Sequence, residues 1–333
     1  MMMFSRKMKM AALGVAAIMS FGLLAGCGSQ DKAGADKKYS IGVVQLVEHD
    51  ALDAANKGFV DALKERGFEA GKNLTIDNQN AQADQSNLQN IGQRFVTNKV
   101  DLIYAIATPA AQTVANLTKD IPIVGCAITD YEAAKLVKTN KAPGGNVTGA
   151  SDMNPIKEQI DLLIKLCPNA KTIGCVYTSS EVNSEIQFKV MKEYAESKGL
   201  KVEAATISTV NDIQQAVQSL TGKVDAFYVP TDNVIASAMP TMIAITEAAK
   251  KPVICGESNM VKAGGLATYG IDYYQLGRQA GMMAADILEG KGKPATMEIQ
   301  NAKNLKAAVN KKNAAKLGIT IPADVLKDAD VIE

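Results

Sequence analysis

The sequence predicts an α/β protein made of two tandem lobes, each with a doubly wound parallel sheet. From Tyr39 onward, short β-branched apolar runs alternate with stretches whose apolar residues recur at helical spacing. Some of these runs, such as Val100–Ala107, are almost wholly apolar, which is typical of strands covered by helices on both faces. The length of 333 residues suggests about two domains, and a hydrophobic content of 47% lets each bury a core.

Four strands are expected in the first lobe, with helices between them. The strands are Tyr39–Gln45, Leu74–Asp77, Val100–Ala107 and Pro122–Ile128. The first helix follows the polar loop Leu46–Asp50, the second is capped by Ser86, and the third begins at Pro109, because proline suits the first turn of a helix. A glycine-rich turn at Gly144–Gly149 and a short extended segment complete one β-α-β-α unit.

The second lobe repeats this alternation without close sequence identity to the first. Its strands are expected at Lys171–Thr178, Val202–Ile207, Val224–Pro230, Pro252–Cys255 and Gly265–Ile271. The first of them leads into a helix with Ser179 or Ser180 at the N-cap position. The helix Val234–Ala249 should be kinked or interrupted near Pro240. A last long helix is expected at Tyr274–Leu288, followed by a short strand at Ala307–Val309.

The first residues have the pattern of an export signal. A basic segment around Lys7 precedes an apolar run, Met10–Leu24, that is too short for a comfortable membrane span. The sequence Leu-Ala-Gly-Cys ending at Cys27 resembles the bacterial lipobox, whose cysteine carries the lipid of the mature protein. We therefore expect a signal peptide over residues 1–26, lipid attachment at Cys27 and a polar tether over residues 27–38. An ordinary signal peptide with an incidental cysteine is the alternative.

Composition and motifs argue against several other functions. A net charge of +1, from 36 basic and 35 acidic residues, and the absence of tryptophan do not suit a nucleic-acid-binding protein. The chain has neither a Gly-rich phosphate-binding motif nor a Gly-x-Ser-x-Gly elbow, and His49 is its only histidine, so no enzyme activity, cofactor or metal site is expected. The cysteines after the leader are expected to be buried small apolar side chains: Cys126, Cys167, Cys175 and Cys255.

Four short motifs, in order along the chain, resemble those of one protein family. They are Ala107–Gln112, Tyr177–Ser184, Tyr228–Asn233 and Gly270–Gly277. The family comprises the lipoprotein substrate-binding components of ABC transporters with the type I periplasmic-binding fold. The resemblance is closest to its tryptophan/tyrosine-type branch and covers the chain from Tyr39 to the C-terminus.

This resemblance implies two lobes joined by a multi-strand hinge, with crossings near Ala150, Asp272 and Ala295. The first lobe is then 39–150 plus 273–294, and the second is 151–272 plus 295–333. It also implies a monomeric, non-enzymatic binding protein that delivers a small solute to an ABC permease and its ATPase. A lipid anchor would hold it on the outer face of the bacterial cytoplasmic membrane or on a periplasm-facing membrane.

The solute expected from this resemblance is an amino acid, in particular an aromatic one. A sugar- or nucleoside-binding lipoprotein is one alternative, although sugar rings usually stack on aromatic side chains such as tryptophan, which the chain lacks. A ligand-sensing domain that acts with a separate signalling partner is the other alternative.

Polar residues follow the expected strands of both lobes at their carboxyl ends, where open parallel sheets bind ligands. These residues are Glu48, His49, Thr108, Thr129, Asp130, Ser179, Ser180, Asp232, Asn233, Glu257, Ser258 and Asp272. Hydroxyl groups and helix N-termini donate to a carboxylate, and acidic side chains accept from an ammonium. Because a zwitterion needs both, we expect an amino acid to bind between the two lobes.

The groups expected to hold the ligand's carboxylate come from both lobes. They are Thr108, the N–H groups of Ala110 and Ala111, Ser179, Ser180 and Asn183, with Thr129 beside them. Several of them also have a purely structural interpretation, because threonine and serine at these positions suit helix caps.

The ligand's ammonium is expected to meet a carboxylate of the second lobe. Asp232 is the first candidate, although the N-cap of the following helix explains it equally well, and Glu257 is the second. If Asp232 holds the ammonium, Asp232→Ala should abolish binding and leave the fold intact. Glu48 and His49 are expected over the ligand's side chain, although His49 suits a surface loop equally.

Overall fold

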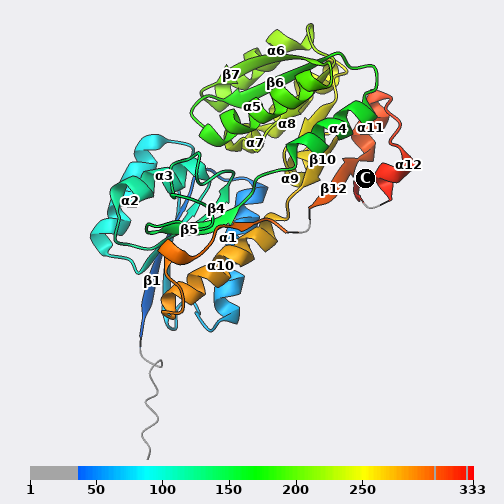
Figure 1. The fold of residues 1–333 in the computed structure, drawn as a ribbon. Helices are drawn as coiled ribbons and strands as arrows, with labels where there is room; N and C mark the ends of the chain where they lie inside the picture. Colours follow the sequence, from blue (N-terminus) through cyan, green and yellow to red (C-terminus); the bar gives the residue numbers. More distant parts are fainter. Residues whose placement is uncertain (1–36, 304, 328) are drawn as a thin grey trace, which may run out of the picture. The chain divides into compact units, whose positions relative to one another are not determined.

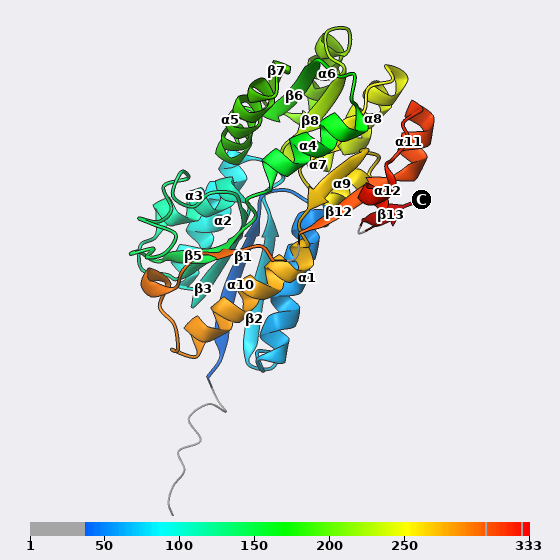
Figure 2. The ribbon, with the colours of Figure 1, turned by 45° about the vertical axis from the view of Figure 1, so that its right-hand side comes forward.

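The computed structural model describes residues 37–303, 305–327 and 329–333. The predicted signal peptide, the predicted lipid attachment site Cys27 and residues 27–36 of the predicted tether lie outside these ranges. Within Lys38–Glu333 the chain builds two lobes, each around a mainly parallel sheet, as predicted (Figure 1 and Figure 2). None of the helices in the described ranges is long and apolar enough to cross a lipid bilayer.

The first lobe is organised around a sheet of strand order β11-β5-β4-β3-β1-β2 in which every pairing is parallel. The strands are β1 (Tyr39–Gln45), β2 (Leu74–Asn80), β3 (Leu102–Ile106), β4 (Ile123–Ile128), β5 (Val147–Ser151) and β11 (Gln300–Asn301). β3 and β4 are buried at every residue, which confirms that these apolar runs are inner strands of a covered sheet. β2 continues beyond its predicted end, to Asn80.

Two helices of this lobe pack against each other through glycine. The helices of the first lobe are α1 (Asp50–Glu65), α2 (Gln85–Asn98), α3 (Thr108–Leu117) and α10 (Tyr273–Leu288). α10 lies beside α1 in both views, as the resemblance implied (Figure 1 and Figure 2). A Cβ added at Gly277 would lie 1.9 Å from the carbonyl oxygen of Ala55, so only glycine permits this approach.

The second lobe has a longer sheet of strand order β13-β12-β10-β9-β8-β6-β7. Its strands are β6 (Thr172–Thr178), β7 (Lys201–Ile207), β8 (Ala226–Val229), β9 (Val253–Cys255), β10 (Ala267–Gly270), β12 (Lys306–Asn310) and β13 (Asp330–Ile332). All pairings are parallel except that of β10 with β12. The core has one cluster on each face: along β8, Tyr228 belongs to one cluster, and Phe227 and Val229 belong to the other.

The helices of the second lobe confirm the predicted break near Pro240 and depart from the prediction at the start of α5. They are α4 (Ile156–Leu166), α5 (Val182–Ser197), α6 (Ile213–Thr221), α7 (Asn233–Ser237), α8 (Met239–Ala248), α9 (Ser258–Lys262), α11 (Lys311–Leu317) and α12 (Ala323–Leu326). The predicted helix Val234–Ala249 is interrupted at Ala238, and Pro240 lies in the first turn of α8, where it needs no N–H. The N-cap of α5 is Glu181, not Ser179 or Ser180.

The hinge differs from the expected division at its third crossing. The chain passes between the sheets after β5 and after β10, close to the predicted Ala150 and Asp272. The third crossing was expected near Ala295, but Gln300 pairs with Ala150 of β5, so the first lobe extends to Asn301 before the chain enters the second sheet. Because β11 is short, the local sequence carries little strand signal, and this pairing sets the boundary.

Candidate functional site

Two side-chain hydrogen bonds join the lobes at the carboxyl ends of their sheets. Nε2 of Gln187, on α5, donates to Oγ1 of Thr129, which follows β4, over 2.9 Å. Nε2 of His49, which follows β1, lies 3.3 Å from Oδ1 of Asn233 at the start of α7. The strand ends of the two sheets therefore face each other, and the polar residues that follow them meet at one interlobe site.

Asp232 has a structural role at this site. It is fully buried, and its Oδ2 accepts from the N–H of Thr178 at 2.6 Å and from the hydroxyl of Ser184 at 2.8 Å. Its Oδ1 accepts from the hydroxyl of Thr178 at 2.8 Å and from the N–H of Ile235 at 2.9 Å, which makes Asp232 the N-cap of α7. A carboxylate has about four acceptor positions. These four hydrogen bonds fill all four positions, so Asp232 acts as a helix cap. No acceptor position of Asp232 is left for the ammonium group that was expected to bind it.

Glu181 is a second buried carboxylate, and it is not among the residues predicted from the sequence. Its Oε1 accepts from the N–H groups of Asn233 and Val234, each at 3.1 Å. Its Oε2 accepts from the side-chain amides of Asn183 at 2.9 Å and Asn233 at 2.5 Å. Glu181 therefore fixes the start of α7 from the N-cap of α5, and it is only 2% exposed.

Glu257 is a third buried acid of the second lobe. It caps α9 by accepting from the N–H groups of Asn259 at 2.6 Å and Met260 at 2.7 Å. Among the described residues no lysine, arginine or histidine forms an ion pair with Glu181, Asp232 or Glu257. Because buried carboxylates without a cation favour the approach of positive charge, this end of the second sheet suits an ammonium group.

Burial raises the pKa of each of these acids, because water no longer solvates the charged form. The pKa of Glu257 rises to about 7, and that of Asp152, which follows β5 in the hinge, rises to about 6. Burial and the neighbouring charge of Asp232 raise the pKa of Glu181. The pKa of Asp232 is itself raised by burial.

We expect the ligand-free protein to resist heat better at pH 5 than at pH 8. An acid whose pKa is higher in the folded state stabilises the fold while protonated, and this contribution is lost as the pH rises through the folded pKa. For Glu257 this contribution is lost between pH 4.5, its usual pKa, and about pH 7, its pKa in the folded protein. Within this range the free energy of unfolding should fall by at most about 1.4 kcal/mol per pH unit. Thermal unfolding of the wild type and Glu257→Gln measures this slope, which should be smaller in the variant. Equal slopes would assign the pH dependence to other groups.

Three buried side chains keep polar atoms without a hydrogen-bond partner in the described part of the chain. They are Thr108 (Oγ1), Asn154 (Oδ1 and Nδ2) and Asn183 (Oδ1). Thr108 begins α3 and Asn183 lies in the first turn of α5, while Asn154 lies on the first hinge crossing. An unpaired buried polar atom costs about 1 to 3 kcal/mol, so these atoms indicate where a polar ligand completes the structure.

The backbone before Thr108 is strained. Ala107 has φ +85° and ψ 154°, a conformation that residues with a Cβ rarely adopt, and it places Thr108 at the start of α3. The Ala111 N–H donates to the carbonyl of Ala107 at 3.1 Å, so it is not free for a ligand as predicted. The Ala110 N–H has no acceptor within the described residues, so its donation to a ligand stays a prediction.

Asn183 and Thr129 both reach the site, and the free polar atom of Asn183 differs from the predicted one. The side-chain N–H groups of Asn183 are taken by Glu181, Ser184 and the carbonyl of Thr231, so its free atom is an acceptor, not a donor. Oγ1 of Thr129 accepts from Gln187 and lies 3.3 Å from Oδ1 of Asp152, to which it donates.

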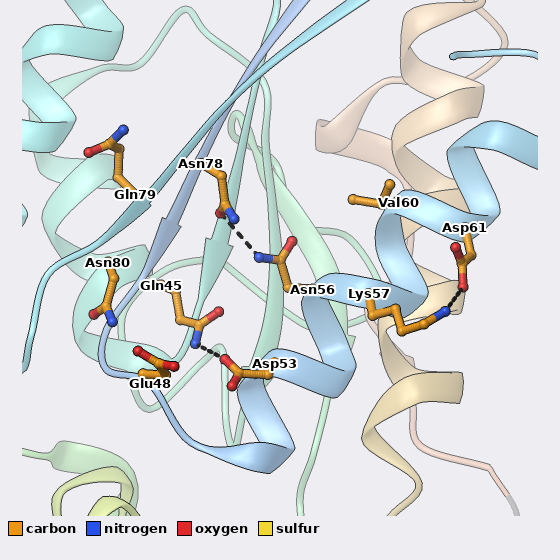
Figure 3. Close-up of a pocket in the computed structure, with 10 residues that line it drawn as sticks. All are labelled: Gln45, Glu48, Asp53, Asn56, Lys57, Val60, Asp61, Asn78, Gln79 and Asn80. Carbon is orange, nitrogen blue, oxygen red and sulfur yellow. Dashed lines mark hydrogen bonds and ion pairs between the residues drawn. The ribbon is translucent and has the colours of Figure 1, made fainter. Parts of the chain in front are cut away.

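Ser179 and Glu48 do not join the other predicted residues. The hydroxyl of Ser179 donates to the carbonyl of Ile207, the last residue of the edge strand β7, so this hydroxyl is already hydrogen-bonded within its own lobe. Glu48 is exposed and lies beside Asn80 at an open depression of about 560 Å³ along β2 and α1 (Figure 3). The depression is lined by Gln45, Glu48, Asp53, Asn56, Lys57, Val60, Asp61, Asn78, Gln79 and Asn80.

Ser180 and His49 lie at the edge of the interlobe site. Ser180 lines a depression of about 420 Å³ with Pro109 and Gln112 of α3, so it adjoins the first lobe. His49 is partly exposed, and burial lowers the pKa of its imidazole, which favours the neutral ring. Its Nε2 then donates to Asn233, because the facing atom is a carbonyl oxygen.

The four cysteines of the described ranges form no disulfide bond. Cys126, Cys175 and Cys255 are buried, Cys167 is partly buried, and all four are unpaired. No group of three or more potential metal ligands is found among the described residues. The cysteine side chains contribute to packing, as the strand positions of three of them predicted.

Ser184 and Gln187, which were missed from the sequence, share one face of α5 with the predicted Asn183. Asn183, Ser184 and Gln187 are all buried, and their spacing places them on one helix face. A buried polar face on a helix that follows a strand of a parallel sheet indicates a site, because a core helix normally buries apolar side chains. Asn154, in contrast, stands alone on a crossing segment, and no periodic signal marks it.

The sequence matches the family described as ABC transporter substrate binding protein over residues 40–332. It is 45% identical over 292 residues to a tyrosine-binding protein of Clostridioides difficile (strain R20291), covering 85% of each chain. An ABC domain from Streptococcus pneumonia in complex with L-Trp is 44% identical, with a TM-score of 0.86 over 89% of this chain and 100% of that one. A ligand-free, open substrate-binding protein with adhesive properties from Clostridium difficile is also 44% identical, with a TM-score of 0.68 over 89% of this chain and 99% of that one.

Proposed function

The chain belongs to the family of ABC transporter substrate-binding proteins, and we propose that it binds an aromatic α-amino acid, tryptophan or tyrosine, between its two lobes. The unpartnered atoms of Thr108, Asn154 and Asn183 carry this proposal. Between them they offer both the donors that an α-carboxylate needs and the acceptors that an α-ammonium needs.

Each end of the zwitterion is assigned to particular atoms. The carboxylate accepts from the hydroxyl of Thr108, the Ala110 N–H and Nδ2 of Asn154, because these are the free donors. The ammonium donates to Oδ1 of Asn154 and Oδ1 of Asn183. Glu181 holds the amide of Asn183 in place by accepting from its Nδ2.

The aromatic character of the ligand rests on the relatives. Two proteins at least 44% identical to this chain are described with tyrosine or L-Trp as the ligand. The described arrangement is nearer to the tryptophan complex than to the open, ligand-free structure, although both are equally similar in sequence. This difference supports a closed arrangement of the lobes, in which buried polar atoms surround the ligand position.

The remaining parts of the proposal concern transport. Cys27 is assigned as the lipid attachment site, so that a monomer works at the outer face of a bacterial membrane. It hands the amino acid to an ABC permease whose ATPase drives import. Loading and unloading follow lobe closure and opening, because the ligand stabilises only the state in which both lobes contact it.

Isothermal titration of the purified protein tests the ligand class. L-Tryptophan or L-tyrosine should bind with one site per chain, and at a hundredfold excess over Kd should add about 2.7 kcal/mol of stability. N-acetyl and methyl-ester derivatives should bind far more weakly, because each removes one charge of the zwitterion. Equal binding of these derivatives, or a melting-temperature shift only with sugars or nucleosides, would contradict the proposal.

A further inference from the structure

Gln187 is placed to connect the second lobe to the first. It is fully buried on α5, and within its own lobe its Oε1 accepts from the N–H of Thr231 at 3.0 Å while its Nε2 donates to the hydroxyl of Thr231. The same Nε2 donates across the interface to Oγ1 of Thr129 at 2.9 Å. The bonds to Thr231 fix the orientation of the amide, so the group that reaches the first lobe is preorganised.

From Thr129 the hydrogen bonds continue into the hinge. The Thr129 hydroxyl donates to Oδ1 of Asp152 at 3.3 Å, and the hydroxyl of Tyr273 donates to Oδ2 of Asp152 at 2.7 Å. Asp152 follows β5 at the first crossing and Tyr273 begins α10 after the second. All of these residues are at most 8% exposed, so water does not compete for the bonds while the lobes adjoin.

We propose that Gln187 and Thr129 form a latch that holds the lobes closed, both in the ligand-free protein and around a bound amino acid, and that Asp152 and Tyr273 connect this latch to the hinge. This inference rests on the proposed function of the interlobe site. The bond between Gln187 and Thr129 exists only while the lobes adjoin, whereas the bonds of Gln187 to Thr231 and of Thr129 to Asp152 lie outside the moving interface. The latch therefore lowers the free energy of the closed state alone, and it should slow ligand release.

The second interlobe bond is a weaker contributor. His49 is partly exposed, and its 3.3 Å contact with Asn233 is longer than the 2.9 Å contact between Gln187 and Thr129. Water replaces such a contact at little cost when the lobes separate. The buried contact between Gln187 and Thr129 should accordingly dominate the stability of the closed state.

Stopped-flow measurement of L-tryptophan and L-tyrosine dissociation tests the latch. Thr129→Val, which keeps the shape but removes the hydroxyl, should raise the dissociation rate constant about tenfold and leave the association rate constant within about twofold. Thr129→Ser restores the hydroxyl and should behave like the wild type. Gln187→Met should match Thr129→Val, and the double variant should be no faster than either, because both changes remove the same bond. Gln214→Met, an exposed change in the same lobe, is the control.

Small-angle scattering of the ligand-free protein tests the latch proposal independently of the proposed amino-acid binding. Thr129→Val should raise the radius of gyration relative to Thr129→Ser, whether or not any amino acid binds. If the wild type binds no amino acid, the proposed function fails while this comparison still decides the latch. An unchanged radius of gyration, additive effects of the two substitutions, or a change confined to the association rate constant would overturn the latch.

Discussion

Replacing Asp232 by alanine is expected to lower the free energy of unfolding of the ligand-free protein by about 3 to 5 kcal/mol. The substitution removes the acceptor of four hydrogen bonds and leaves donors of Thr178, Ser184 and Ile235 buried without a partner. Chemical denaturation measures the loss. The sequence by itself led to the opposite expectation, an intact fold that no longer binds its ligand.

Asp84→Ala is the matched control for this prediction. Asp84 is exposed and caps α2 through one bond, from the N–H of Asn87 at 2.8 Å. Its loss should cost about 1 kcal/mol, the usual value for a helix N-cap. If Asp232→Ala costs no more than Asp84→Ala and yet abolishes amino-acid binding, Asp232 is the ammonium partner and the capping interpretation is wrong.

Replacing Asn154 by leucine is expected to weaken amino-acid binding about a hundredfold and to make the ligand-free protein more stable. Both polar atoms of this buried amide lack a partner within the described residues, so an apolar side chain of similar shape removes an unpaired group. Binding suffers because the amide contacts both ends of the proposed ligand, and a hundredfold loss is about 2.7 kcal/mol. Titration calorimetry and thermal unfolding of the same preparation measure the two effects.

Asn146→Leu provides the contrast. Its side-chain amide donates to the carbonyls of Thr118 at 3.1 Å and Ile121 at 2.8 Å, so it is an asparagine with partners in the first lobe. Its replacement should lower the stability and leave the affinity unchanged. If Asn154→Leu lowers the stability in the same way, the Asn154 amide has a partner in the folded protein and its assignment to the ligand fails.

Asn154→Leu and Asn146→Leu are expected to change the stability in opposite directions, and the binding function explains this difference. A binding site must keep some polar atoms unpaired until the ligand arrives, and the fold bears that cost in the ligand-free state. The strained backbone at Ala107, directly before Thr108, is a second such cost at the same site. Ligand binding then recovers stability in proportion to the contacts that it completes.

Much of the fold could be predicted because its signals are local. The apolar run at β3 predicted a strand buried on both faces, Pro109 marked the start of α3, and Pro240 marked the break that separates α7 from α8. The site residues were harder to predict. Ser179 and Asp232 have the residue types that a ligand needs, but these types also suit ordinary caps and turns.

The sequence by itself determined the alternation of strands and helices, the two lobes and the polar strand ends, because periodicity and chain order suffice for these. Only the tertiary structure decided which polar groups are already satisfied. Asp232 accepts a hydrogen bond from Thr178, 54 positions away, and Glu181 accepts one from Asn233, 52 positions away. The side-chain amide of Asn154 has no hydrogen-bond partner among the described residues. A hydrogen bond depends on the positions of both partners in space, so the free atoms of a site emerge only when distant segments are brought together.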